Sequence, residues 1–150
     1  ARVRKLILSC TTPGPRHTSF PWALVPKLLD KGRLKVLANI LFPEAYQRAE
    51  PERVRWFMQR ALKRPVDRQV FLRQFACCAL FSTKARLSTI KAPTLVMTGD
   101  EDALVDQKGS IMIASLVPGA QLQVFPGGGH GFMLQNAEKV HALIHRFLTS

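Results

Sequence analysis

Two loops of this sequence carry residue types that could do chemistry together. Residues 98–105 (TGDEDALV) include Asp102, and residues 127–132 (GGGHGF) include His130. A carboxylate that accepts the Nδ1 proton of an imidazole fixes its tautomer and leaves Nε2 free as a general base. Glycines around His130 allow a tight loop that brings the imidazole in from the side. Asp100, nearer the start of its loop, is the alternative acid.

Each of these loops follows a short apolar run that predicts a buried strand. The predicted strands cover residues 3–9, 94–97 and 121–125, each bounded by proline or glycine. Parallel strands of an open α/β sheet place their carboxyl ends at one edge, where such sheets bind ligands. We therefore expect Asp102 and His130 to meet there. Amphipathic patterns predict helices at 107–117 and 136–148, the second with Asn136 as its N-cap.

The middle of the chain has a different pattern. Its pattern indicates no strand and predicts short helices at 21–31, 33–41, 51–62 and 65–80. A parallel crossover needs only about a dozen residues, so an insertion of this length is expected to form a lid. The predicted fold class is α/β: three parallel strands with flanking helices, and an inserted all-helical cap. The core is expected at residues 1–17 and 86–150, and the cap at 18–85.

The composition is that of a soluble globular protein with a basic excess. Hydrophobic residues make up 47% of the 150, and the formal net charge is +12. No apolar run reaches the ~20 residues of a membrane-spanning helix. Arginines interleaved with aromatic residues at 48–73 suggest polyanion binding as an alternative function. Their helical spacing instead favours helices with the aromatics on an apolar face and the arginines on a solvated one. We therefore do not expect a nucleic-acid partner.

Cysteine usage predicts a reducing compartment and no metal site. The sequence has three cysteines, an odd number: Cys10, Cys77 and Cys78. We expect their thiols to be free and the protein to be cytoplasmic. None has metal-ligand spacing with a histidine. His141 and His145 are four residues apart on a predicted helix, but no third ligand accompanies them. We expect neither a metal nor a cofactor.

Several segments together resemble the C-terminal part of the α/β-hydrolase family. They are APTLVMTGDEDALV, LVPGAQLQVFPGGGHGF and the closing amphipathic helix. RVRKLILSCTTPGP resembles the strand after the family's nucleophile-bearing unit, and the helical middle resembles its cap. The resemblance implies that Asp102 is the acid and His130 the base of a catalytic triad. It also implies a carboxylic ester, lactone or similar small acyl substrate, which we expect Cys10, Thr11 and Phe132 to contact.

The family's nucleophile lies in Gly-x-Ser-x-Gly at a strand-to-helix turn, and this sequence contains no such motif. Cys10 could replace the serine chemically, but it runs into a proline loop and nothing indicates the electropositive site that forms a thiolate. We therefore expect this chain to be the C-terminal portion of a hydrolase and to be inactive alone. Its strand from Val3 to Leu8 is expected to expose an edge that pairs with a second copy or with an upstream half.

Overall fold

A computed structural model describes residues 2–18, 23, 26–27, 33–63 and 67–150. Its strands are β1 (Leu6–Ser9), β2 (Thr94–Gly99) and β3 (Gln121–Phe125). Between β1 and β2 the described residues include the helices α2 (Arg33–Leu41), α3 (Glu44–Ala49), α4 (Pro51–Leu62), α5 (Arg68–Leu80) and the 3₁₀ helix η1 (Lys84–Thr89). The remaining helices are α6 (Gln107–Leu116), α7 (Phe132–Gln135) and α8 (Ala137–Thr149).

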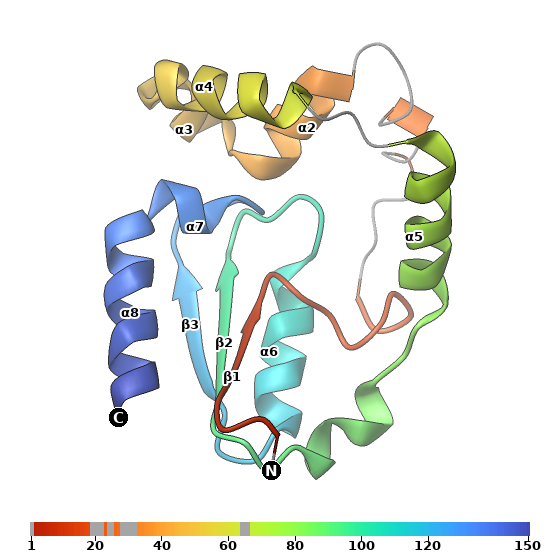
Figure 1. Cartoon of the computed structure of the whole chain (residues 1–150), viewed down its shortest axis with the longest axis vertical. Coiled ribbons are helices and arrows are strands. Elements are labelled where there is room, and N and C mark those ends of the chain that lie inside the picture. The colour runs from red at the N-terminus through yellow and green to blue at the C-terminus, as the bar shows by residue number, and fades with distance from the viewer. Residues whose placement is uncertain (1, 19–22, 24–25, 28–32, 64–66) are drawn as a thin grey trace.

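The three strands form one parallel sheet in the order β1-β2-β3. Helix α8 covers one face and α6 covers the other (Figure 1). The central strand β2 is buried along its whole length, and its side chains alternate between the two layers. Leu95 and Met97 pack on the α8 side, and Val96 packs on the α6 side. The predicted α/β fold class is therefore confirmed.

Strand β1 begins later than the sequence predicted, at Leu6 rather than Val3. The register pairs Leu6 with Thr94, and the Leu6 N–H donates to the Pro93 carbonyl at 2.9 Å. A ladder that continued toward Val3 would run past Pro93, which has no N–H to donate. Val3 is accordingly 53% exposed. The predicted strands at 94–97 and 121–125 correspond to β2 and β3.

The last helix, α8, is fastened to the sheet at its C-terminal end. Lys5, just before β1, donates from Nζ to the carbonyl oxygen of Phe147 at 2.7 Å and to that of Leu148 at 3.3 Å. No backbone N–H of the helix reaches these carbonyls of the last turn, so the ammonium bonds to both, and the Phe147 carbonyl also accepts the Ser150 hydroxyl at 3.1 Å. At the other end, Asn136 precedes the helix but makes no side-chain capping bond. Asn136 is therefore at the predicted N-cap position, but its Nδ2 donates to the Phe132 carbonyl at 3.2 Å and its side chain does not cap the helix.

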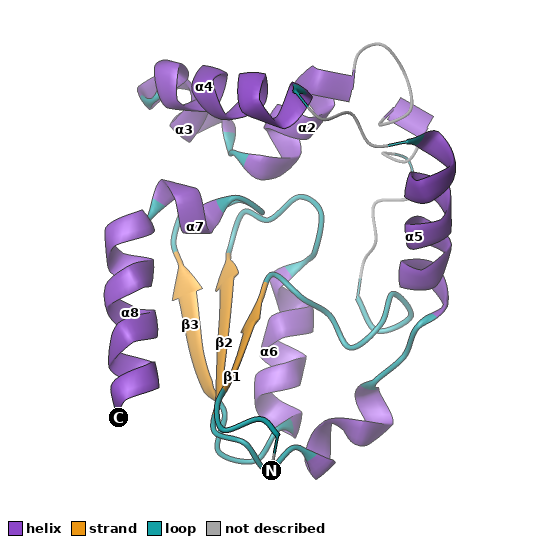
Figure 2. Cartoon of the chain, viewed as in Figure 1, coloured by secondary structure: helices purple, strands orange, loops and turns teal. Residues whose placement is uncertain are grey.

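The segment between β1 and β2 is helical wherever it has regular structure among the described residues. Helices α2, α3 and α4 lie over the carboxyl ends of the strands, and α5 stands to one side of the sheet (Figure 2). The patterns at 33–41, 51–62 and 65–80 correspond to α2, α4 and α5. The predicted helix at 21–31 lies largely outside the described residues. Whether residues 18–85 behave as a separate cap domain stays a prediction.

None of the helices in the described part of the chain is long and apolar enough to cross a membrane.

Candidate active site

Asp102 lies in the loop that follows β2, and its two carboxylate oxygens have different hydrogen-bond partners. Oδ1 accepts the backbone N–H groups of Leu104 at 2.9 Å and Val105 at 2.8 Å. These two bonds fix the orientation of the carboxylate and direct Oδ2 toward His130. The Asp102 side chain has no exposed surface.

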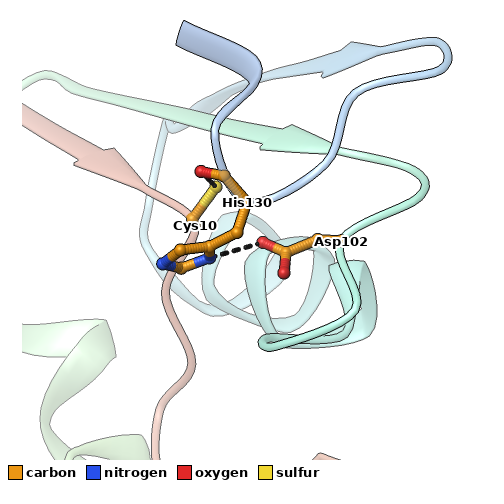
Figure 3. A group of neighbouring side chains, drawn as sticks. All are labelled: Cys10, Asp102 and His130. Atoms are coloured by element: carbon orange, nitrogen blue, oxygen red, sulfur yellow. Dashed lines mark hydrogen bonds and ion pairs between the residues drawn. The ribbon is translucent and has the colours of Figure 1, made fainter. Parts of the chain in front are cut away.

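His130 lies in the glycine loop between β3 and α7, and its ring faces this carboxylate. Nδ1 of His130 and Oδ2 of Asp102 are 2.9 Å apart. Figure 3 shows Nε2 on the side of the ring that points away from Asp102. The His130 side chain is 26% exposed, so the ring is held on one side and accessible on the other. The sequence-predicted pair is therefore brought together.

The environment of Asp102 favours its charged form. Burial raises the pKa of the carboxyl, but the hydrogen bond from His130, its charge and the N–H groups of Val105 and Leu104 act in the opposite direction. The net effect lowers the pKa of Asp102 below its usual value. An ionised carboxylate can only accept hydrogen bonds. Nδ1 of His130 therefore carries the proton of this contact, and in the neutral ring Nε2 is a free base.

Asp100, the alternative acid, has a structural contact instead. It is exposed, and its Oδ1 accepts the Gly127 N–H at 2.7 Å, which ties the carboxylate loop to the start of the histidine loop. The structure therefore places Asp102, and not Asp100, against the imidazole.

The histidine loop (residues 127–131) packs closely against the end of β2. A Cβ on Gly99 would lie 2.0 Å from the carbonyl oxygen of Gly128, so only glycine allows β2 and this loop to approach. The side chain of Gln135 in α7 spans the loop. Its Oε1 accepts the Gly129 N–H at 2.8 Å, and its Nε2 donates to the Gly127 carbonyl at 3.0 Å.

The histidine loop also bonds to the C-terminal end of α2. The N–H of His130 donates to the Ile40 carbonyl at 3.3 Å, and that of Gly131 donates to the Leu41 carbonyl at 2.8 Å. A Cβ on Gly131 would meet the Leu41 oxygen at 2.9 Å and the Phe42 ring at 3.0 Å. The helical segment thus contacts the backbone on which His130 is mounted.

Sequence reasoning missed both supports of the histidine loop, Gln135 and the end of α2. The four glycines in residues 127–131 were the available signal, since glycine recurs where backbones approach closely. They indicated that something packs on the loop, but no local pattern identified what it is.

Cys10 follows β1 and adopts a left-handed backbone conformation, with φ of 46°. Its thiol donates to the His130 carbonyl at 3.6 Å. Burial, and after it the negative charge of Asp102, raises the pKa of Cys10 to about 12. The thiol is therefore protonated at neutral pH, which argues against Cys10 as a replacement nucleophile.

Thr11 and Phe132 contact other parts of the fold. The Thr11 carbonyl accepts the Ser110 hydroxyl at 3.1 Å, which joins this segment to α6. Phe132 has 0% exposure and stacks on Phe125 with ring centroids 4.8 Å apart. The Phe132 ring thus lies in the core beneath the site, and its contact with substrate stays a prediction. For Cys10 and Thr11, both half-buried, substrate contact stays a prediction.

Comparison with known proteins identifies the framework. Residues 1–143 match the model of the alpha/beta hydrolase family. The chain belongs to the α/β-hydrolase family. It is 29% identical to a 2-hydroxymuconate semialdehyde hydrolase of Pseudomonas putida, covering 98% of this chain and 54% of that protein. It is 42% identical, over 43% of its length and 24% of the relative, to a non-heme haloperoxidase of Rhodococcus erythropolis.

Solved structures of this α/β-hydrolase fold agree with the family match. A hydrolase from Pseudomonas aeruginosa PA01 superposes with a TM-score of 0.80 at 24% identity, covering 99% of this chain and 57% of the other. Aligned along nearly all its length, the chain thus spans about half of the Pseudomonas putida hydrolase and of the Pseudomonas aeruginosa hydrolase.

Proposed function

We propose that this chain supplies the acid and the general base of a serine hydrolase that acts on a carboxylic ester, lactone or similar small acyl substrate. The observation that carries the proposal is the 2.9 Å contact between His130 Nδ1 and Asp102 Oδ2, with Nε2 on the open side of the ring. The family and its hydrolase relatives support the reaction class. They do not identify a substrate.

In the proposed reaction, Nε2 of His130 removes the proton of a nucleophilic hydroxyl as the oxygen attacks the acyl carbon. The imidazolium so formed is stabilised by the Asp102 carboxylate, which stays ionised. Nε2 then returns the proton to the leaving oxygen, and an acyl ester on the nucleophile remains. Water attacks that ester in a second cycle with the same proton transfers, which releases the acid and restores the hydroxyl.

We propose that the nucleophile of this reaction comes from outside residues 1–150, which contain no Gly-x-Ser-x-Gly motif. Among the described residues, no hydroxyl or thiol forms a hydrogen bond with His130 Nε2. We propose that the nucleophile is carried by an upstream half, on a strand that pairs with the outer edge of β1; a second copy of this chain could pair with that edge but would bring no such motif. That edge lies next to the loop of Cys10, whose thiol contacts His130. The helices over the sheet would then cover the substrate as a cap.

The test measures labelling by a fluorophosphonate serine probe and turnover of an aryl ester. This chain alone is expected to show neither. A longer gene product that contains it is expected to show both, and His130→Ala should abolish turnover. Asp102→Asn should reduce kcat by about 10⁴-fold with little change in KM, because the imidazole takes the wrong tautomer. Asp100 is exposed, so Asp100→Asn is the matched control, and its kcat should stay within a few-fold of the wild-type value.

Two results would contradict the proposal. One is turnover in the longer protein that survives His130→Ala. The other is turnover by this chain alone that His130→Ala abolishes, which would place a nucleophile within residues 1–150. Polyanion binding is not proposed as a second function. The basic residues of the helical segment include Arg48 and Arg55, which are paired with Glu44 and Glu52, and Arg60, which lies over Trp56.

A further inference from the structure

Three side chains of metal-ligand type converge where β1, β2 and β3 end. They are the thiol of Cys10, the carboxylate of Asp102 and the imidazole of His130, each from a different loop (Figure 3). One donor atom from each lies within 4.8 Å of the other two. In the sequence these residues are far apart, so their spacing gave no sign of a metal site. The fold alone assembles the group.

We propose that Cys10, Asp102 and His130 form a binding site for a thiophilic divalent cation, with Zn²⁺ as the representative ion. Thiolate, imidazole and carboxylate are the three ligand types that proteins use for Zn²⁺, and three protein ligands with an open fourth position are a common arrangement. The proposed hydrolysis does not require such a site.

The spacing of the donors suits a small ion. Three atoms that lie within 4.8 Å of one another can all be reached from one point at about 2.8 Å or less, against Zn²⁺ bond lengths of about 2.0–2.3 Å. Closing the remaining gap needs shifts of roughly half an ångström in side chains. The 26% exposure of the His130 side chain leaves a path for the ion to enter.

The carboxylate geometry predicts which cations bind. Oδ1 of Asp102 is already occupied by the Leu104 and Val105 N–H groups, so Oδ2, which accepts the His130 Nδ1–H in the metal-free chain, is the oxygen that would bind a metal. One carboxylate oxygen with a sulfur and a nitrogen suits Zn²⁺ or Co²⁺ and does not suit Mg²⁺ or Ca²⁺, which need several oxygen ligands. Selectivity for the thiophilic ions therefore follows from the donor set.

Binding exchanges one proton for one metal–sulfur bond. The Cys10 thiol gives up its contact with the His130 carbonyl, its S–H proton passes to solvent, and the thiolate sulfur binds the cation. The hydrogen bond between His130 Nδ1–H and Asp102 Oδ2 breaks, the Nδ1 proton moves through solvent to Nε2, and Nδ1 and Oδ2 both bind the cation. A metal held here competes for the groups that orient His130, so we expect it to inhibit hydrolysis. That consequence rests on the proposed function, whereas metal binding itself does not.

Co²⁺ absorption spectroscopy of this chain tests the site without any activity measurement. The background is a variant in which Cys77→Ser, Cys78→Ser and His141→Gln remove the exposed thiols of α5 and one histidine of the α8 pair. Adding Co²⁺ should give a near-ultraviolet thiolate-to-cobalt band that saturates at one equivalent. Zn²⁺ should abolish the band, and Mg²⁺ should leave it unchanged.

Variants of the three ligands decide the outcome. Cys10→Ser should remove the band, and Asp102→Asn and His130→Gln should each weaken Co²⁺ binding at least tenfold, with circular dichroism as the control for folding. Absence of the band in the folded background protein would overturn the proposal, and so would a band that survives Cys10→Ser. Either result leaves the tautomer of His130 and the proposed hydrolase role untouched, so the two proposals fail separately.

Discussion

At the residue scale, the site depends on the different surroundings of its two acidic side chains. Asp100 and Asp102 are two positions apart, yet one braces a loop from the exposed surface and the other lies buried against His130. The sequence named both as candidates and favoured Asp102. Nothing in the local pattern reveals that the Oδ1 of Asp102 accepts two backbone N–H groups of its own loop, which is what directs its other oxygen at the histidine.

Asp102 should link folding stability to pH. Its pKa is lowered in the folded chain, so the unfolded state binds more protons and the stabilisation is complete only above the unfolded pKa of about 3.9. It is lost as pH falls through the lower, folded pKa. Asp102→Asn should reduce the free energy of unfolding by about 1–3 kcal/mol at pH 7. In urea titrations this deficit should shrink below about pH 4.

The exposed Asp100→Asn serves as the control for that experiment. It retains an acceptor oxygen for Gly127 and should lower the free energy of unfolding by no more than about 0.5 kcal/mol. A deficit for Asp102→Asn that stays constant from pH 7 to pH 3 would show that the charge of Asp102 is not what stabilises the pair.

The three thiols should differ in their reactivity. Cys77 and Cys78 are exposed on α5, whereas Cys10 is half-buried and its pKa is raised to about 12. Alkylation with iodoacetamide at pH 8 should therefore modify two cysteines of the native chain and three of the unfolded chain, as counted by intact mass. Equal rates at all three positions would show that Cys10 is neither shielded nor held as a protonated thiol.

At the element scale, the loops depend on contacts between segments far apart in sequence. Apolar runs bounded by proline and glycine predicted β2 and β3 closely, and amphipathic periodicity predicted α6 and α8, because these signals are local. The start of β1 depends on where Pro93 falls in the neighbouring strand. Gln135 and the carbonyls of α2 reach the histidine loop only after folding. Such partners leave no periodic trace in the sequence.

Docking of α2 on the histidine loop should be sensitive to one added methyl group. Gly131→Ala places a Cβ about 2.9 Å from the Leu41 oxygen, and we expect a loss of about 1–3 kcal/mol in the free energy of unfolding. The amide protons of His130 and Gly131, which bond to α2, should exchange with solvent faster.

Gly119→Ala is the comparison variant for the docking of α2. It adds a Cβ where no atom lies within 4 Å, so backbone strain from its φ of 70° is the only penalty. Exchange at His130 should then be unaltered. Unchanged amide exchange at His130 in Gly131→Ala would mean that α2 does not hold the loop.

At the scale of the whole molecule, the outer edge of β1 pairs with no other strand among the described residues. The N–H groups of Leu6 and Cys10 donate toward β2. In a parallel ladder alternate residues face opposite sides, so those of Ile7 and Ser9 face outward. Unpaired groups on an apolar strand are a template for another strand. The resemblance to the family predicted this edge, whereas the identity of a partner depends on a second chain or segment.

The free edge should make the chain self-associate when no complementary strand is present. We expect dimers or larger species at micromolar concentration by size-exclusion chromatography with light scattering. Salt should favour them, since it screens the repulsion of a +12 charge. Ser9→Pro removes one outward N–H and should shift the chain toward monomer, whereas Ser9→Ala keeps that N–H and should not. A wild-type monomer with rapidly exchanging amides at Ile7 and Ser9 would contradict the paired edge.

The central claim is that Asp102 holds His130 with its proton on Nδ1 and leaves Nε2 free as a base. Long-range ¹⁵N–¹H NMR of the neutral imidazole reports the tautomer directly, with His130→Gln to assign the signals. We expect the Nδ1–H tautomer for His130 in the wild-type chain, lost in Asp102→Asn and kept in Asp100→Asn. An Nε2–H tautomer in the wild-type chain, or an Nδ1–H tautomer that Asp102→Asn leaves unchanged, would contradict the claim.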